Sequence, residues 1–283
     1  MEATPETSAS RFAGPRESGV APSPDAPPLL SLRGITKSFG AVQALRHVDL
    51  DIPAGQVTAL VGDNGAGKST LIKTISGIWA PTSGQIFWKG KEVHVHSPRE
   101  ASDLGIATVY QDLALCDNLD IVQNMYLGRE ETSRGVLDEI EMEIATRKTL
   151  SDLSVSTVKS VRQMVGSLSG GQRQAVAVAR AVMRESELVI LDEPTAALGV
   201  SQTAQVLELI KTLKSHGLGV LVISHNLSDV FAVADRLATM YLGTLVDSGP
   251  IANYDTASAV ELITTGSSSR RPSAVPVSES MEG

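Results

Sequence analysis

The stretch "VTALVGDNGAGKST", residues 57–70, joins an apolar run to a glycine-rich loop and then to a helical pattern. Its second part fits G-x-x-x-x-G-K-[ST], and the strand and helix that this motif requires are both predicted around it. Glycines let backbone N–H groups approach phosphate oxygens closely, and the amino end of the following helix adds positive potential. We predict that the loop binds nucleotide phosphates through Gly62, Asp63, Asn64, Gly65, Ala66, Gly67, Lys68, Ser69 and Thr70. A glycine-rich turn that merely caps a helix is the alternative.

Two residues of this loop have chemistry of their own. Lys68 offers a point charge for the β and γ phosphates, which makes it a candidate catalytic residue. The Ser69 hydroxyl is a hard oxygen ligand of the kind that Mg²⁺ prefers. A nucleoside triphosphate and Mg²⁺ are therefore the expected ligands.

A second apolar run, "LVILDE" at residues 188–193, ends in two adjacent acids. We expect this strand to lie beside the phosphate-loop strand, with its carboxyl end at the ligand crevice. Asp192 would then face Mg²⁺, directly or through water, and Glu193 would orient and polarise water against the γ-phosphate. The alternative is that both acids simply end a strand at the surface.

Composition narrows the class of protein. The 283 residues carry a net charge of −8 and no block of five or more Lys or Arg, so nucleic acid is not an expected partner. Cys116 is the single cysteine, which excludes an internal disulfide and fits a reducing compartment. No apolar run approaches about 18 residues and the first residues lack the apolar core of a secretory signal, so a membrane role would require a partner.

The chain divides into two tails and one domain. Residues 1–28 and 267–283 are rich in Pro, Ser and Ala or Glu, and we predict that both are disordered. Within residues 29–266, apolar β-branched runs alternate with amphipathic helical patterns, which predicts an α/β domain with a mainly parallel sheet covered on both faces. Residues from about 119 to 184 read mostly as helix and interrupt this alternation, which indicates an inserted helical subdomain at about 112–184.

The sequence "LSGGQ", Leu168 to Gln172, precedes a long helical pattern. Ser169 suits the N-cap of that helix, and the two glycines suit a turn. A functional interpretation is a second anion-binding site, made by a hydroxyl, free backbone N–H groups and a helix amino end.

In chain order, residues 30–250 hold the phosphate loop, Gln111 in "VYQD", "LSGGQ", "LVILDE" and His225 in "VISH". This ordered set resembles the ATP-binding cassette (ABC) ATPases. The resemblance implies a P-loop NTPase fold of the ABC type, with an antiparallel β subdomain and the inserted helical one, and ATP hydrolysis by head-to-tail dimers.

The resemblance also implies roles for single residues. Ser169, Gly170 and Gly171, with Gln172 of the same motif, would contact the γ-phosphate of ATP bound to the other subunit. His225 would sense the γ-phosphate, and Gln111 would link Mg²⁺ to the membrane partner. Phe39 in "KSFG" stands where an aromatic residue stacks on adenine, and Phe keeps the stacking face.

The segment "QDLALCDNLDIVQNMYLGRE", residues 111–130, and "DEPTAALGV" are similar to the carbohydrate-importing branch, whose members handle monosaccharides such as ribose, xylose or fructose. That branch commonly carries two cassettes in one chain, so a functional dimer here would be two copies. The resemblance implies an ATPase subunit on the cytoplasmic face of the membrane, which drives a separate permease fed by a sugar-binding protein. An importer of another solute, or an ABC protein acting on ribosomes or DNA, are the alternatives.

Gly199 departs from the pattern of many ABC ATPases, in which an acid at this place helps to couple the two sites of the dimer. The sequence "AALG" offers no carboxylate there. One interpretation is a weakened hydrolytic site. The interpretation that we favour is geometric: a residue without Cβ permits a close approach or an unusual φ. The loop would then meet its twin across the dimer by backbone contact rather than by charge, in an active ATPase.

Overall fold

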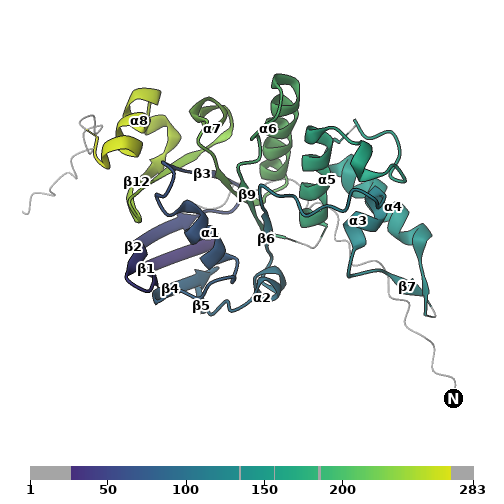
Figure 1. Cartoon of the computed structure of the whole chain (residues 1–283), viewed down its shortest axis with the longest axis horizontal. Helices are drawn as coiled ribbons and strands as arrows, with labels where there is room; N and C mark the ends of the chain where they lie inside the picture. The colour runs from purple at the N-terminus through teal and green to yellow at the C-terminus, as the bar shows by residue number, and fades with distance from the viewer. Residues whose placement is uncertain (1–26, 134, 156, 184–185, 269–283) are drawn as a thin grey trace, which may run out of the picture.

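The structure, a computed structural model, describes residues 27–133, 135–155, 157–183 and 186–268. The two tails predicted to be disordered, 1–28 and 267–283, lie almost wholly outside these residues. Figure 1 shows an antiparallel sheet beside a central sheet, with α6, α7 and α8 along one side and a helical part at the far end. Among the described residues, no helix combines the length and the apolar character that crossing a membrane requires.

The central sheet has six strands in the order β12-β11-β3-β10-β9-β6. All neighbouring pairs are parallel except β11 and β12. Every residue of β3 and β10 is buried, as parallel strands covered on both faces require. The six strands are β3 (Val57–Gly62), β6 (Ile106–Val109), β9 (Leu188–Asp192), β10 (Gly219–Ile223), β11 (Arg236–Tyr241) and β12 (Thr244–Pro250).

The prediction that β9 lies directly beside the phosphate-loop strand β3 was wrong. β10 lies between β3 and β9, and its Val220 pairs with Val57 on one side and Val189 on the other. The three strands are similar apolar runs, so their patterns predict burial but not lateral order. The carboxyl ends of β3, β10 and β9 nevertheless meet at one edge of the sheet, because the three strands are parallel.

The antiparallel sheet confirms the predicted β subdomain, with the strand order β2-β1-β4-β5. Phe39 and Val42 form the last register pair between the first two strands, next to the tight turn that joins them. Its strands are β1 (Leu30–Phe39), β2 (Val42–Ile52), β4 (Ser83–Trp88) and β5 (Lys91–Val93).

Helices cover both faces of the central sheet, and the core accordingly forms two clusters. Side chains of β3 alternate between them: Val57, Ala59 and Val61 belong to one cluster, and Leu60 to the other. The helices outside the insertion are α1 (Lys68–Ile75), α2 (Pro98–Asp103), α6 (Val200–Ser215), α7 (Leu227–Val233), the 3₁₀ turn η2 (Ile251–Asn253) and α8 (Thr256–Thr265).

The predicted helical insertion is present between β6 and β9. Arg162 ties its loops and helices together through ion pairs with Asp120, Glu139 and Glu143. A short hairpin in the same part was not predicted, because its strands are only two residues long each. The elements are α3 (Ile121–Tyr126), β7 (Thr132–Ser133), β8 (Val136–Leu137), α4 (Glu139–Asp152), the 3₁₀ turn η1 (Val165–Ser167) and α5 (Gly170–Val182).

Candidate nucleotide site

The phosphate loop turns from β3 into α1 against the turn between β11 and β12. A Cβ at Gly62 would collide with the Met240 carbonyl oxygen, and one at Gly67, where φ is +103°, would lie 2.9 Å from the Ala44 carbonyl oxygen. The Gly243 N–H donates to the Ala66 carbonyl at 2.9 Å, which braces the loop from behind. These two glycines are therefore required by packing inside the chain, and the exposed residues 63–65 form the open side of the loop.

Lys68 begins α1 and is 8% exposed. Its Nζ donates to the carbonyl oxygens of Gly62 at 2.7 Å and Asp63 at 3.0 Å, so the ammonium lies within the curve of the loop. Burial lowers the pKa of Lys68, and the nearby Glu193, Asp63 and Asp192 oppose that shift. A cation held in this way is preorganised for phosphate oxygens. Beside it, the Ser69 side chain is exposed and Thr70 is partly buried.

The paired acids lie at the same edge of the sheet, as predicted. Asp192 ends β9, and burial together with the Glu193 charge raises its pKa, while Lys68 and Lys73 pull it down. Two adjacent carboxylates beside a single buried ammonium leave local negative charge, which a divalent cation would neutralise. The idea that the acids merely end a strand at the surface is not supported, because both side chains are partly buried.

Glu193 and His225 form a contact that the sequence alone did not predict. Glu193 Oε2 lies 2.8 Å from His225 Nδ1, and the Glu193 side chain is 17% exposed against 70% for His225. The Glu193 N–H donates to the Ile223 carbonyl at the end of β10. Glu193 adopts φ of +50°, a left-handed backbone that costs on the order of 1–3 kcal/mol in a residue with a side chain. Such strain is often found at functional sites.

Gln111 follows β6 by two residues and is exposed. Because β6 pairs with β9, Gln111 stands at the same edge of the sheet as Asp192. Among the described residues, Gln111 forms no hydrogen bond with either acid.

Phe39 is 42% exposed and packs edge-on against Trp79, with ring centroids 4.7 Å apart. Val42, its cross-strand neighbour, is 66% exposed. Trp79 holds the Lys73 ammonium 4.8 Å from its ring centroid. This exposed apolar and aromatic surface suits a stacked base. Trp79 and Val42 were missed by the sequence analysis; an aromatic in the loop after α1 was the available signal for Trp79.

The signature residues lie at the amino end of α5. Ser169 is the N-cap of this helix: its Oγ accepts from the Gln172 N–H at 3.3 Å, and Gln172 Oε1 accepts from the Ser169 N–H at 2.9 Å. A Cβ at Gly170 would lie 2.8 Å from Leu198, and one at Gly171 would lie 3.2 Å from Gln202 of α6. The capping interpretation is thus confirmed as local geometry. Among the described residues, the signature lies against the helical part, Leu198 and α6, and it forms no hydrogen bond with the phosphate loop.

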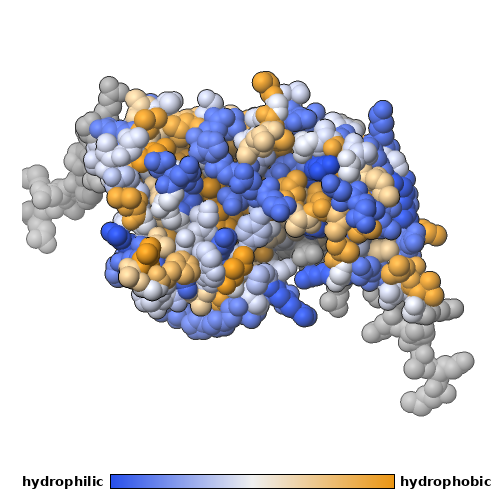
Figure 2. Space-filling model, viewed as in Figure 1, coloured by the Kyte–Doolittle hydropathy of each residue, from blue (hydrophilic) through white to orange (hydrophobic). Residues whose placement is uncertain are grey.

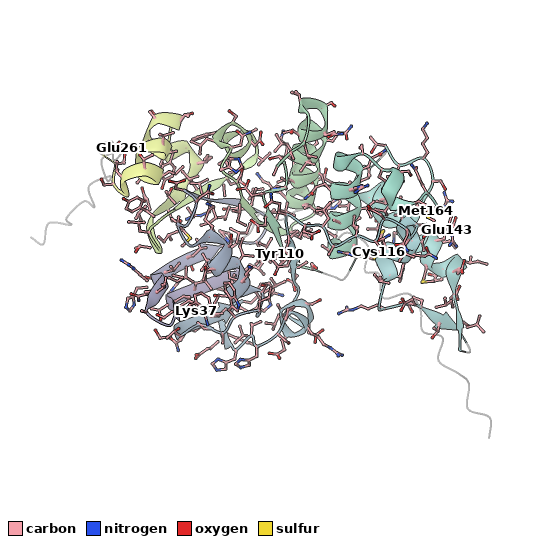
Figure 3. All side chains as sticks on the ribbon, in the orientation of Figure 1. Lys37, Tyr110, Cys116, Glu143, Met164 and Glu261 are labelled. Carbon is pink, nitrogen blue, oxygen red and sulfur yellow. The ribbon has the colours of Figure 1, made fainter. Side chains whose placement is uncertain are left out.

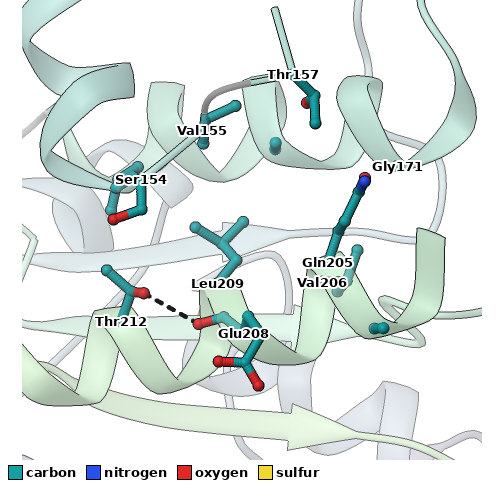
Figure 4. A pocket seen from close by; sticks show the side chains of 12 residues that line it. Ser154, Val155, Thr157, Gly171, Gln205, Val206, Glu208, Leu209 and Thr212 are labelled. Atoms are coloured by element: carbon teal, nitrogen blue, oxygen red, sulfur yellow. Dashed lines mark hydrogen bonds between the residues drawn. The ribbon is translucent and has the colours of Figure 1, made fainter. Parts of the chain in front are cut away.

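A cavity of about 320 Å³ lies next to the signature, where α5, α6 and the loop after α4 meet. Figure 4 shows Gly171, Gln205 and Leu209 along it, together with the Thr212 hydroxyl that donates to the Glu208 carbonyl within α6. Its lining is mostly apolar and includes no residue of the phosphate loop or the paired acids. This cavity is therefore separate from the phosphate loop and the paired acids of the same chain.

The unusual φ that the geometric interpretation of Gly199 allowed is absent, whereas a backbone contact across the dimer stays a prediction. Gly199 has φ of −75° and ψ of 164°, an extended backbone that any residue adopts, and a Cβ there would meet nothing within 4 Å. Gly199 is the N-cap of α6, and its N–H donates to Gln202 Oε1 at 3.3 Å. The position therefore requires no glycine inside one subunit.

Replacing Gly199 with Asp should stabilise the protein by a few tenths of a kcal/mol, because an Asp at the N-cap can accept a hydrogen bond from the first turn of α6. Urea unfolding of the isolated chain measures this change. Gly199→Ala is the matched control, since alanine is a poor N-cap and should destabilise. An Asp variant less stable than the Ala variant would show that the N-cap assignment is mistaken.

Comparison with known proteins adds a family to this geometry. The family model described as "ABC transporter" matches residues 45–196. The fructose import ATP-binding protein of Rhizobium meliloti is 48% identical over 223 residues, 76% of this chain and 86% of that protein. The xylose/arabinose import ATP-binding protein of Sulfolobus acidocaldarius is also 48% identical, over 77% of this chain and 86% of its own length. A ribose import ATP-binding protein of Rubrobacter xylanophilus is 39% identical, and the match spans 47% of its length.

Solved structures agree with the sequence relatives. An ATP-binding cassette of an ABC transporter in its ADP conformation matches with a TM-score of 0.72 and 27% identity, over 84% of this chain and 95% of that one. A nucleotide-free cassette of an ABC transporter matches with a TM-score of 0.71 and 28% identity, over 78% and 91% of the two chains. With its phosphate loop, paired acids and signature helix in place, the chain belongs to the ABC transporter family and is an ATP-binding cassette ATPase.

Proposed function

We propose that this chain is the ATP-hydrolysing subunit of a sugar importer and energises a separate membrane permease. The observation that carries the catalytic part is the 2.8 Å contact of His225 with Glu193, beside the buried Lys68. The sugar part rests on the two relatives that import fructose and xylose/arabinose, each 48% identical to this chain over 86% of its own length.

The residues present fit a magnesium nucleotide. Lys68 holds its ammonium inside the loop, the Ser69 hydroxyl is exposed next to it, and Phe39 offers a half-exposed ring for the base. Ser69, Asp192 and Gln111 are the oxygen ligands proposed for Mg²⁺, which when bound would neutralise charge on the phosphates. Among the described residues, no cluster of three or more His, Cys, Asp or Glu forms a metal site. This agrees with a cation that keeps water and phosphate oxygens among its ligands.

The proposed division of work places Glu193 as the group that orients water and accepts its proton. His225 occupies Oε2 of that carboxylate, and among the described residues Oε1 accepts no hydrogen bond, which leaves this atom for water. Lys68 and the loop N–H groups would stabilise the charge that develops on the transferred phosphoryl group. Because the exposed His225 ring contacts Glu193 directly, a movement of His225 would change the orientation of the Glu193 carboxylate.

A head-to-tail pair of chains is the proposed functional unit. In one chain the signature contacts α6 and the helical part, so it would reach phosphates only in a second copy. The first N–H groups of α5 and the Ser169 hydroxyl are the donors that would be offered there.

The proposed partner is a permease, with a sugar-binding protein acting on it from the other side of the membrane. Figure 2 shows apolar surface at the end of the molecule that carries β7 and β8. Val136, Ile140 and Ile144 are 70%, 75% and 56% exposed there. Exposed apolar side chains gathered in one part of a protein often mark a contact with a partner. The chain would thus be held peripherally at the cytoplasmic face of the membrane.

Sugar-dependent ATP hydrolysis tests the proposed function. The tagged chain is used to isolate its permease from membranes, and the complex is reconstituted in liposomes with a monosaccharide-binding protein. We expect fructose, xylose, arabinose or ribose to stimulate phosphate release several-fold. Stimulation by amino acids but by none of these sugars would refute the sugar assignment, and co-sedimentation with ribosomes without any permease would refute the transport role.

A further inference from the structure

The loop that carries Gln111 is held from behind by an arginine of the signature helix. Arg180 lies near the end of α5, where its Nη1 donates to the Ala114 carbonyl at 2.9 Å and its Nη2 donates to the Leu113 carbonyl at 2.9 Å. The loop runs from Tyr110 at the central sheet to Cys116 in the helical part, as Figure 3 shows. Arg180 therefore binds the segment that joins the central sheet to the helical part, at the carbonyls two and three residues after Gln111.

The environment of Arg180 is unusual for a cation. Its side chain is partly buried, and burial lowers the pKa of the guanidinium. Among the described residues, no carboxylate lies within 4.0 Å of it. Burying a charge without a counter-ion is costly, so the two charge-assisted bonds to carbonyls are what this side chain gains from its position.

Further contacts fix the rest of the same loop. Arg173, also on α5, forms an ion pair with Asp117 at 3.3 Å. Asn124 of α3 is fully buried, and it accepts from the Cys116 N–H at 2.7 Å and donates to the Cys116 carbonyl at 3.0 Å. Ala114, one of the carbonyls that Arg180 holds, has φ of +47°, a left-handed backbone that persists in a non-glycine residue only where the surroundings impose it. The back of the loop is thus rigidly attached, while Gln111 at its front is exposed.

We propose that Arg180 is a positioning residue that fastens the Gln111 loop to the helix that carries Ser169, so that α5 links two nucleotide sites. Arg180 and Ser169 are eleven residues apart on one continuous helix, which is about 16 Å. In the head-to-tail pair of the proposed function, on which this inference rests, Gln111 serves the chain's own nucleotide and Ser169 serves the partner's. A shift of the loop would then move the signature in the other site.

The planar fork of arginine suits this role better than lysine would. Two parallel N–H groups reach two successive carbonyls and so fix the direction of the loop as well as its distance. An ammonium at the end of a flexible chain can reach one carbonyl at a time. Lysine should therefore hold the loop only in part.

Hydrogen exchange and steady-state kinetics of Arg180→Met and Arg180→Lys test the proposal. In the Met variant, amide exchange should become faster both at residues 112–118 and at residues 168–172, because the link between them is lost. ATP turnover should fall by about tenfold to a hundredfold at an unchanged KM for ATP, since small misplacements of positioning groups cost this much. The Lys variant should show exchange rates and an ATP turnover between those of the wild type and those of the Met variant. Arg147→Met, which removes an exposed ion pair on α4, is the matched control and should change neither quantity.

The exchange measurement keeps this proposal separate from the proposed function, because it needs no permease and no sugar. Faster exchange confined to residues 112–118, with normal exchange at residues 168–172 and a normal kcat, would reduce Arg180 to a local support and overturn the proposal. Should the Met variant not fold, the Lys variant carries the test alone, and wild-type exchange and kcat in it would overturn the need for the fork. A chain that hydrolyses no ATP in any complex, yet shows the coupled exchange, would refute the proposed function and leave the link intact.

Discussion

Replacing Lys68 with Ala should abolish ATP binding or nearly abolish it. Lys68 is the buried cation of the loop, where the Gly62 and Asp63 carbonyls hold its Nζ at 2.7 Å and 3.0 Å. Removing a cation that is buried against phosphates costs about 2–5 kcal/mol, or roughly 30-fold to 5,000-fold in affinity. A binding titration with ATP in the presence of Mg²⁺ measures the loss.

The Gly62 carbonyl loses its Lys68 hydrogen-bond donor in this variant, so the phosphate loop itself could collapse. The control must therefore separate this structural effect from the loss of attraction between Lys68 and the phosphates. Thermal unfolding without nucleotide shows whether the fold is kept. Lys73→Ala is the matched variant: it removes an ammonium from the same helix, but one that lies 4.8 Å from the Trp79 ring centroid. We expect a far smaller effect there. Unchanged ATP affinity in Lys68→Ala would refute the role given to Lys68.

The same variant reports on the head-to-tail pair when it is mixed with Ser169→Arg. Ser169 caps α5, and among the described residues it forms no hydrogen bond with the phosphate loop of its own chain. Ser169→Arg should therefore stop turnover while that chain still binds ATP. A mixed pair has one intact composite site and one doubly damaged site. Partial recovery of ATPase activity is expected if a single competent site turns over, whereas equal loss of ATP binding in the two separate variants would argue against the arrangement.

Local features of the site could be predicted because they depend on neighbours in sequence. The apolar run 57–61 had to be a covered strand, Gly67 and Lys68 had to begin a helix, and the two acids had to end a strand. Parallel strands then bring their carboxyl ends together, whatever their order. This is why Asp192 and Glu193 lie near Lys68, although β10 and not β9 is the neighbour of β3.

Features that depend on distant pairing could not be predicted. The position of β10 follows from long-range register, and the grip of Arg180 on Leu113 and Ala114 joins residues 67 and 66 positions apart. Gly199 shows the opposite error for backbone geometry: its identity suggested an unusual φ, but within the chain the residue has an ordinary extended φ and open space around it. A glycine in sequence does not indicate strain unless a neighbour or a positive φ requires it.

Glu193→Gln should keep ATP binding and stop hydrolysis. The amide occupies the space of the carboxylate, and its oxygen or nitrogen can keep the contact that now joins Oε2 to His225 Nδ1 at 2.8 Å. The backbone at φ +50° is equally accessible to both residues, and the bond from the Glu193 N–H to the Ile223 carbonyl does not involve the side chain. What is lost is the capacity to accept a proton from water, which is worth about a hundredfold to ten thousandfold in rate.

Phosphate release measures hydrolysis by the Glu193→Gln variant, and a sizing column measures its oligomeric state. Glu208→Gln is the matched control, because the Glu208 carboxylate is exposed on α6 and pairs only with Lys211 among the described residues. Without water activation, the pair of chains closed on ATP should persist, so the Glu193 variant should elute as a dimer in ATP and as a monomer without it. Loss of binding and hydrolysis together would mean that the carboxylate supports the loop through Lys68, and near-normal phosphate release would remove Glu193 from the hydrolytic step. The two outcomes differ because the Glu193 carboxylate interacts with the Lys68 ammonium only through its charge, whereas it contacts His225 directly. A variant that binds ATP as wild type, dimerises and does not hydrolyse it therefore assigns water activation to this one carboxylate.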